Sequence, residues 1–355
     1  MVRGGAGPGR GTHRRQHVRG SAGAEVPECH VKDEIDQHID HVRALTVRGG
    51  PLDTRAPTAS VNNPEWFATP TVPRLGRAML HQQLRDELLD GVSIDNRHAM
   101  VMAGPPGAGK STLRRGPLRD ELVGHVVLDV DDIKRKLLEI AQADGTYESF
   151  LKPTGVRDLE AAGERFFPLE LSALVHLEAV GIAVTARQQA TAAGMPLLID
   201  GVLSNADVAI SDGQELETAG YRIDVVCMDA SPAVSEYQIR QRWREAYEKT
   251  LVGEGDLMGG RWVPSSFAQH VLNGPGGRSL PALSAEQLAR NVHAVTRYRV
   301  YTRSSIDAAT MLTVDLSRSR PGGPLMDTEA AEASRAAQLP YSRRSRPAAG
   351  QDLDR

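Results

Sequence analysis

Short, unbroken apolar runs alternate with amphipathic segments through the middle of the chain. We expect the runs at 98–103, 125–130, 196–200, 221–228 and 309–315 to be strands. Such runs suit strands covered on both faces, and their alternation with helices indicates a parallel sheet with crossover helices. The pattern therefore predicts an α/β fold with flanking helices, whose ligands bind beyond the carboxyl ends of the strands.

The N-terminal quarter has a helical pattern instead. Apolar residues recur at the spacing of a helix over 30–47, and a second helix is expected at about 75–89. Prolines and small polar residues between them exclude a long regular element. Residues 26–90 are thus predicted to be a helical extension that precedes an α/β domain over 91–316.

Both ends of the chain have the composition of disordered segments. Residues 1–25 are rich in glycine and arginine, and 317–355 are rich in Arg, Ser, Pro and Ala. We interpret 1–25 as a disordered basic arm and 317–355 as a disordered tail. The arm could touch nucleic acid, but a solvated, inert arm is the favoured interpretation.

Overall composition narrows the classes of function. The 355 residues are 40% hydrophobic, enough for a sizeable core, and the net charge of -3 gives no global case for nucleic-acid binding. Cys29 and Cys227 match neither a metal spacing nor a disulfide framework. No apolar run was expected to span a membrane, and no secretion signal was identified, so a cytoplasmic protein is expected.

The strongest motif is a phosphate-binding loop directly after the strand at 98–103. It reads Gly104-Pro105-Pro106-Gly107-Ala108-Gly109-Lys110-Ser111, followed by Thr112. Its glycines let backbone N–H groups surround phosphate oxygens at a helix N-terminus. Lys110 would contact the β- and γ-phosphates, and the Ser111 hydroxyl would coordinate Mg²⁺. The motif predicts ATP and Mg²⁺ as cofactors.

Acidic residues end two of the predicted strands. In Asp129-Val130-Asp131-Asp132 we expect Asp129 and Asp131 to share a strand face and Asp132 to cap the next helix. A carboxylate such as Asp131 can accept the proton of an acceptor hydroxyl in phosphoryl transfer, although the cluster could serve only as a helix cap. Asp200 closes the strand at 196–200, where it could hold magnesium, bind substrate or cap a loop.

These motifs resemble, in order and spacing, those of the zeta toxin family. The phosphate loop is followed by Asp129 to Lys134, by Asp200-Gly201, by Ile239-Arg-Gln-Arg242-Trp243 and by Gly260-Arg261-Trp262. The resemblance covers roughly 95–275. It implies a phosphate-loop kinase that phosphorylates the 3′-hydroxyl of the amino sugar in UDP-N-acetylglucosamine, and a small helical antitoxin as a possible partner.

The resemblance also implies residue roles. Asp131 corresponds to the base, Lys110 to the phosphate ligand, and Arg242 and Arg261 to the arginines that clamp the phosphates. Asp129, Asp200 and Ser204 are expected on the acceptor side. Arginine suits the clamp because its planar fork carries a fixed charge, although Arg242 could also be an ordinary arginine of a charged helix.

The acceptor side departs from the family pattern. Val202 and Ser204 stand where the best-known members carry threonine and arginine. Three interpretations therefore remain open: a sugar-nucleotide kinase, another small-molecule kinase acting on an antibiotic or nucleoside, and a nucleotide-binding module without catalysis. The presence of Asp131 and both arginines counts against the third.

Overall fold

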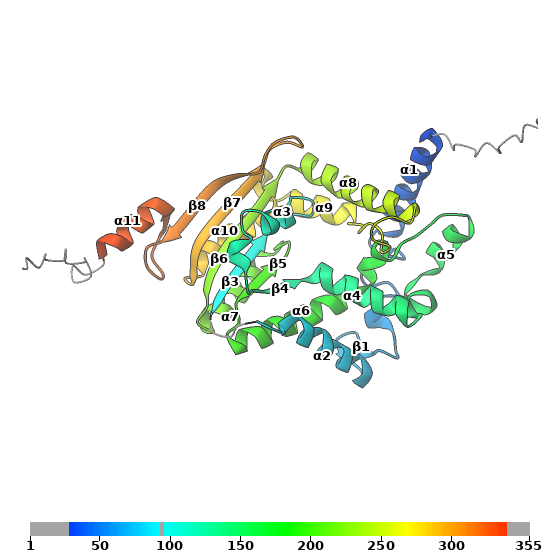
Figure 1. Cartoon of the computed structure of the whole chain (residues 1–355), viewed down its shortest axis with the longest axis horizontal. Helices are drawn as coiled ribbons and strands as arrows, with labels where there is room; N and C mark the ends of the chain where they lie inside the picture. The colour runs from blue at the N-terminus through cyan, green and yellow to red at the C-terminus, as the bar shows by residue number, and fades with distance from the viewer. Residues whose placement is uncertain (1–27, 93–95, 339–355) are drawn as a thin grey trace, which may run out of the picture.

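The computed structural model describes residues 28–92 and 96–338. Its central feature is a sheet of seven strands in the order β4-β5-β3-β6-β7-β8-β9 (Figure 1). Strands β4 to β7 are parallel, and β8 and β9 continue the sheet in antiparallel fashion. The strands are β3 His98–Ala103, β4 Val126–Asp129, β5 Leu197–Asp200, β6 Arg222–Ala230, β7 Val295–Arg303, β8 Met311–Arg318 and β9 Leu325–Asp327.

Helices cover both faces of this sheet, as the apolar strands require. Odd-numbered residues of β3 pack in one core with α7 (Ala206–Thr218) and α10 (Leu280–Asn291), while its even-numbered residues face α3 (Lys110–Arg115) and the start of α8 (Pro232–Leu251). The division follows from the alternation of side chains along a strand. The predicted α/β fold with a mainly parallel sheet is confirmed.

A second, helical core lies next to the β4 edge of the sheet (Figure 1). It unites the N-terminal extension with the rest of the chain, because buried residues of the first helix pack with those of α4, α6 and α8. Its helices are α1 Glu28–Leu45, α2 Leu75–Leu89, α4 Val130–Ala143, α5 Thr154–Ala161 and α6 His176–Ala193. Between α1 and α2 the chain forms only turns, one 3₁₀ turn and the two short strands β1 Phe67–Thr69 and β2 Val72–Pro73.

The segment Pro168–Ala193 corrects the expectation that no apolar run could span a membrane. It is long and apolar enough to do so by length and composition, and 56% of its most apolar window is buried inside the fold. Glu170 and Glu178 lie within it and are hydrogen-bonded inside the protein. Such a segment is typical of a core helix.

The prediction of a disordered tail from 317 onward is wrong for residues 317–338. Strand β8 continues to Arg318, and β9 and α11 (Thr328–Gln338) follow it. The buried Arg318 side chain donates to the backbone carbonyls of Val295 at 2.9 Å and of Ala289 at 2.7 Å, so this segment is held by polar contacts rather than by an apolar run. The remainder, 339–355, and the basic arm at 1–25 lie outside the described residues.

Strand β7 was not predicted either. Its sequence places arginines among the apolar residues: Arg297 pairs with Asp315, the buried Arg299 pairs with Glu121, and Arg303 donates to the backbone carbonyl of Ala308. These charges interrupt the apolar run that would have marked a buried strand. The sheet therefore extends further from the phosphate loop than its apolar runs indicated.

A buried ion pair fastens α2 to α6. The fully buried carboxylate of Glu178 accepts hydrogen bonds from Arg77 Nε at 2.5 Å and Nη2 at 2.9 Å, and from His81 Nε2 at 2.6 Å. Burial alone would raise its pKa, but the bonds from His81 and Arg77 lower the pKa of Glu178 to about 2. The carboxylate is therefore ionised at neutral pH and dependent on its partners.

We predict that Glu178→Gln lowers the free energy of unfolding by about 3–5 kcal/mol, because it leaves the buried Arg77 without a counter-charge. The matched control is Glu87→Gln, whose ion pair with Lys136 joins two exposed side chains and whose loss should cost less than about 1 kcal/mol. Urea unfolding of both variants measures the difference. Equal losses of unfolding free energy in the two variants would show that the ion pair between α2 and α6 stabilises the fold no more than an exposed pair does.

Candidate active site

The phosphate loop joins β3 to α3 along a path that only glycine can follow. Gly107 has φ +75°, and a Cβ atom there would lie 2.5 Å from the carbonyl oxygen of Ser235. Gly109, with φ +112°, directly precedes the first turn of α3. A side chain at either position would displace the loop, so the glycines fix its shape before any ligand arrives.

Helix α8 supports the loop from the opposite side. The buried Ser235 hydroxyl donates to the carbonyl of Pro106, and the Ile239 side chain lies against Gly107. Arg242 follows on the same helical face, since residues three and four apart are neighbours on a helix. One face of α8 thus both supports the loop and presents an arginine to the site.

Lys110 is the half-buried cation at the centre of the loop. Its ammonium group donates to the Gly104 carbonyl at 2.7 Å. Burial lowers the pKa of Lys110, the carboxylate of Asp200 opposes that shift, and the charges of Arg261 and Arg242 add to it. The predicted site residues from three distant parts of the sequence therefore act electrostatically on one ammonium group.

Two carboxylates meet at the carboxyl edge of the sheet. Asp129 ends β4 and Asp200 ends β5, and they are partners in the parallel ladder. Arg114 of α3 bridges them: its Nη1 lies 2.9 Å from Asp129 Oδ2 and 3.1 Å from Asp200 Oδ2. Burial and the charge of Asp129 raise the pKa of Asp200, while Lys110 and Arg114 lower it.

Asp131 lies on a helix rather than on the strand where we placed it. Strand β4 ends at Asp129, whose Oδ1 accepts the Asp131 backbone N–H at 3.0 Å and so caps α4. The expected cap, Asp132, lies instead within the first helical turn and is exposed. The prediction failed because an N-cap residue has extended backbone geometry and reads as the end of a strand.

The Asp131 carboxylate contacts two cations. Lys134, one turn along α4, places its Nζ 3.1 Å from Oδ1, and Arg261 forms an ion pair with Oδ2. Arg261 approaches from the loop between α8 and α9 (Ser265–Leu272). The carboxylate predicted to be the base is therefore held between positive charges at the edge where the phosphate loop lies.

Each of the two predicted clamp arginines precedes a buried tryptophan. Trp243 and Trp262 pack edge to face, with ring centroids 5.6 Å apart and planes at 87°. Gly260 lets the chain pass the backbone of Trp243, because a Cβ atom there would lie 2.5 Å from the Trp243 carbonyl oxygen. This close passage places Arg261 beside Arg242.

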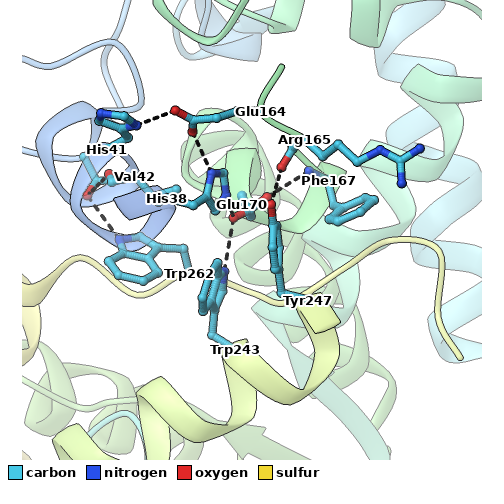
Figure 2. Close-up of polar contacts among 11 residues, drawn as sticks. His38, His41, Val42, Glu164, Arg165, Phe167, Glu170, Trp243, Tyr247 and Trp262 are labelled. Atoms are coloured by element: carbon cyan, nitrogen blue, oxygen red, sulfur yellow. Dashed lines mark hydrogen bonds and ion pairs between the residues drawn. The ribbon is translucent and has the colours of Figure 1, made fainter. Parts of the chain in front are cut away.

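Polar contacts of the two tryptophans reach the N-terminal helix (Figure 2). Trp243 Nε1 donates to Glu170 Oε1 at 3.2 Å, and the same carboxylate binds His38 of α1 at 2.9 Å. Trp262 Nε1 donates to the Thr46 hydroxyl at 3.1 Å, just after α1 ends. Helix α1 is thus part of the scaffold behind the arginines.

Comparison with known proteins identifies the family to which the chain belongs. The family model described as Zeta toxin matches residues 86–305, which includes the phosphate loop, Asp131, Asp200 and both arginines. The chain belongs to the zeta toxin family. This membership indicates an ATP-dependent phosphotransferase.

Solved structures with similar folds share little sequence with this zeta toxin family member. A complex of AvrRxo1-ORF1 and AvrRxo1-ORF2 with sulphate ions is 15% identical over 76% of this chain and 75% of that chain, with a TM-score of 0.48. The same complex with ATP has a TM-score of 0.47, at 15% identity and with the same shares covered. The PezAT chromosomal toxin–antitoxin system of Streptococcus pneumoniae is 16% identical over 67% of this chain and 79% of that chain, with a TM-score of 0.41. No curated protein matches the sequence.

The turn after β5 carries residues that we predicted on the acceptor side. The Gly104 N–H donates to the Val202 carbonyl at 3.4 Å, so this turn lies against the start of the phosphate loop. Leu203 has φ +59°, the one positive value outside glycine among the described residues. Non-glycine residues rarely adopt this conformation, and they cluster at binding sites. Ser204 follows, half-buried, four residues after Asp200.

Sequence reasoning missed Arg114 and Ser235 and gave Lys134 no role. Arg114 had a local signal, because it lies four residues after Lys110 and so shares its helical face. Ser235 lies one helical turn before Ile239 and two turns before Arg242. This spacing could have indicated that the three residues share one face of a helix. The partners of these residues are distant in sequence, however, and only the fold brings them together.

Titration of Lys134 provides a test of this charge cluster. Burial lowers the pKa of Lys134 to about 8 from 10.5, with the Asp129 carboxylate opposing. Between these two pH values the unfolded chain binds more protons at this position than the folded one, so the free energy of unfolding should rise with pH.

We predict that this rise between pH 8 and 10.5 is lost in Lys134→Met, which lacks the titrating group. Urea unfolding of both proteins at several pH values across that window measures the difference between them. A difference that stays constant with pH would mean that Lys134 keeps its ordinary pKa, held there by its ion pair with Asp131.

Proposed function

We propose that this protein transfers the γ-phosphoryl group of ATP to a hydroxyl of a small molecule, with the 3′-hydroxyl of UDP-N-acetylglucosamine as acceptor. The observation that carries the proposal is the position of Asp131. Asp131 lies at the start of α4, its backbone N–H donates to Asp129 at the edge of the sheet, and its carboxylate contacts Arg261. Such a carboxylate can take a proton from an acceptor placed at the γ-phosphate. The identity of the acceptor rests on the family resemblance.

Each of the predicted site residues has a separate role in an in-line displacement at the γ-phosphorus. Lys110 holds the β- and γ-phosphates, and Asp131 removes the proton from the acceptor hydroxyl. That oxygen forms a bond to the γ-phosphorus while the bond from phosphorus to the oxygen bridging the β- and γ-phosphates breaks, and ADP leaves. Arg242 and Arg261 offset charge on the equatorial oxygens, because catalysis of phosphoryl transfer is chiefly positioning and electrostatic stabilisation.

Arg261 has two competing partners in this scheme. In the structure it pairs with Asp131, and such a pairing stabilises the carboxylate and weakens it as a base. Phosphate oxygens accept bidentate contacts from arginine at least as well as a carboxylate does. A γ-phosphate beside Arg261 would compete with Asp131 for the guanidinium and would leave the carboxylate a stronger base.

Oxygen ligands suited to Mg²⁺ surround the first turn of α3. The Ser111 side chain is exposed there, and the Asp200 carboxylate lies nearby at the sheet edge. Within residues 28–92 and 96–338 no group of three or more His, Cys, Asp or Glu side chains is arranged to hold a metal. This fits Mg²⁺, which keeps several waters and binds through few protein oxygens together with substrate phosphates. Mg²⁺ would supply charge neutralisation between the β- and γ-phosphates.

A different small-molecule acceptor is the second candidate. The observation that favours it is the turn after β5, where Val202 and Ser204 replace the family's threonine and arginine and Leu203 adopts a positive φ. These differences would change the contacts made to an acceptor, whereas the phosphate-loop motif is complete. A cytoplasmic location, where ATP is available, and a small helical antitoxin remain parts of the proposal that rest on the family.

We predict that Asp131→Asn lowers kcat for transfer to UDP-N-acetylglucosamine by about 10²–10⁴-fold, the contribution of a general base, while the Kd for ATP changes only a few-fold. Asp132→Asn is the control, since it removes an acid from the same helical turn and leaves Asp131 in place. Coupled-assay kinetics and ATP titration measure both quantities. Asp131 is not the base if the two variants lose activity equally, or if Asp131→Asn retains wild-type kcat.

A further inference from the structure

Arg114 occupies a position between the nucleotide site and the base. It lies four residues after Lys110 on α3, so both side chains leave the helix on the same face. Its side chain is 24% exposed, and its Nη1 contacts both Asp129 and Asp200. The guanidinium is therefore held within the sheet edge rather than in solvent.

The two carboxylates need a permanent cation between them. Asp129 and Asp200 are ladder partners on adjacent strands, and neighbouring strands lie only about 4.8 Å apart. Two carboxylates this close repel, so one tends to take up a proton. An arginine stays protonated at every relevant pH and can hold both acids at once. Arg114 therefore offsets the charge of both strand-end acids and holds their side chains together.

The Asp129 carboxylate connects Arg114 to Asp131 through hydrogen bonds at both of its oxygens. One oxygen, Oδ2, accepts from Arg114 at 2.9 Å, and the other, Oδ1, accepts the Asp131 N–H at 3.0 Å. Both oxygens of one carboxylate are thus engaged, one by the helix that carries Lys110 and the other by the helix that carries the base. A loss at either end lets the Asp129 side chain rotate.

We propose that Arg114 is a positioning residue, which acts through Asp129 to fix Asp131 relative to the phosphates that Lys110 binds. Arg114 itself contacts neither acceptor nor γ-phosphate in this scheme. The inference rests on the proposed phosphotransferase function for its kinetic consequence, but its structural part stands without it. The alternative for the same contacts is a latch, in which Arg114 blocks the two acids and must leave before catalysis.

Arg114→Met tests the inference because it keeps an unbranched apolar chain like the stem of arginine and removes the charged guanidinium. We expect kcat to fall by about 10–10²-fold, the loss that a displacement of about 1 Å can cause, with the Kd for ATP within a few-fold of wild type. Arg114→Lys retains a charge but can satisfy the two carboxylates less well, so its kcat should be intermediate. Arg119→Met, an exposed position beyond the same helix, is the control and should behave as wild type.

Hydrogen–deuterium exchange adds a readout that does not depend on activity. Exchange of the peptide over 129–134 should be faster in Arg114→Met, because the Asp131 amide loses its fixed acceptor, whereas exchange in α10 should be unchanged. The double variant Arg114→Met/Asp129→Asn should lower kcat no further than the more severe of the two single variants does, since both substitutions act through the same carboxylate.

Several outcomes overturn the inference. Wild-type kcat and exchange in Arg114→Met would show that the contacts have no positioning role, and a raised kcat would show that Arg114 is a latch. Global loss of exchange protection in Arg114→Met, accompanied by full activity in Arg114→Lys, would show a merely structural role. If the wild-type protein transfers no phosphoryl group, the proposed function fails, while the exchange at 129–134 still decides whether Arg114 fixes the base.

Discussion

Balance of charge at the carboxyl edge of β4 and β5 is the constraint on which this site depends. Asp129, Asp131 and Asp200 gather there, and a triphosphate would add several more negative charges to the same small volume. Lys110, Arg114, Lys134, Arg242 and Arg261 offset them, each from a helix or loop that the sheet edge brings into place. Because these cations share the acids as partners, the side chains of the site hold one another in place.

The scaffold behind the site explains why so much of the chain belongs to one fold. The sheet aims the phosphate loop and the two strand-end acids, while the helical core next to β4 holds the tryptophans that anchor the arginines. The N-terminal extension is part of this second core, since Thr46 and His38 hold the tryptophan and glutamate side chains behind the clamp. Changes in α1 can therefore affect the segments that carry Arg242 and Arg261 without contacting the arginines.

Local sequence signals predicted the donor half of the site and the central strands. The phosphate loop is contiguous, and its glycines are required by backbone geometry at Gly107 and Gly109, so a short motif specifies it. The buried strands could be predicted because both of their faces are apolar.

Strand β7 was not predicted because it contains the buried Arg299, whose charge is neutralised by Glu121 far away in the sequence. Residues 317–338 were predicted to be disordered because the sequence does not show that the Arg318 side chain donates to backbone carbonyls. The partners of Arg114 could not be predicted, because its two carboxylates are 15 and 86 residues away in the sequence. Asp131 was placed on the wrong element, and its assignment as the base stays a prediction.

The destination of the γ-phosphoryl group tests the central claim most directly. Purified protein is incubated with γ-labelled ATP, Mg²⁺ and, in separate reactions, UDP-N-acetylglucosamine, other sugar nucleotides, nucleosides and aminoglycosides, and the label is followed by chromatography and mass spectrometry. We expect the label to leave ATP and to appear as a phosphomonoester on a hydroxyl of UDP-N-acetylglucosamine. Label on another acceptor alone would keep the kinase and replace its substrate. Label that stays in ATP, or passes only to water, with every acceptor would contradict the account.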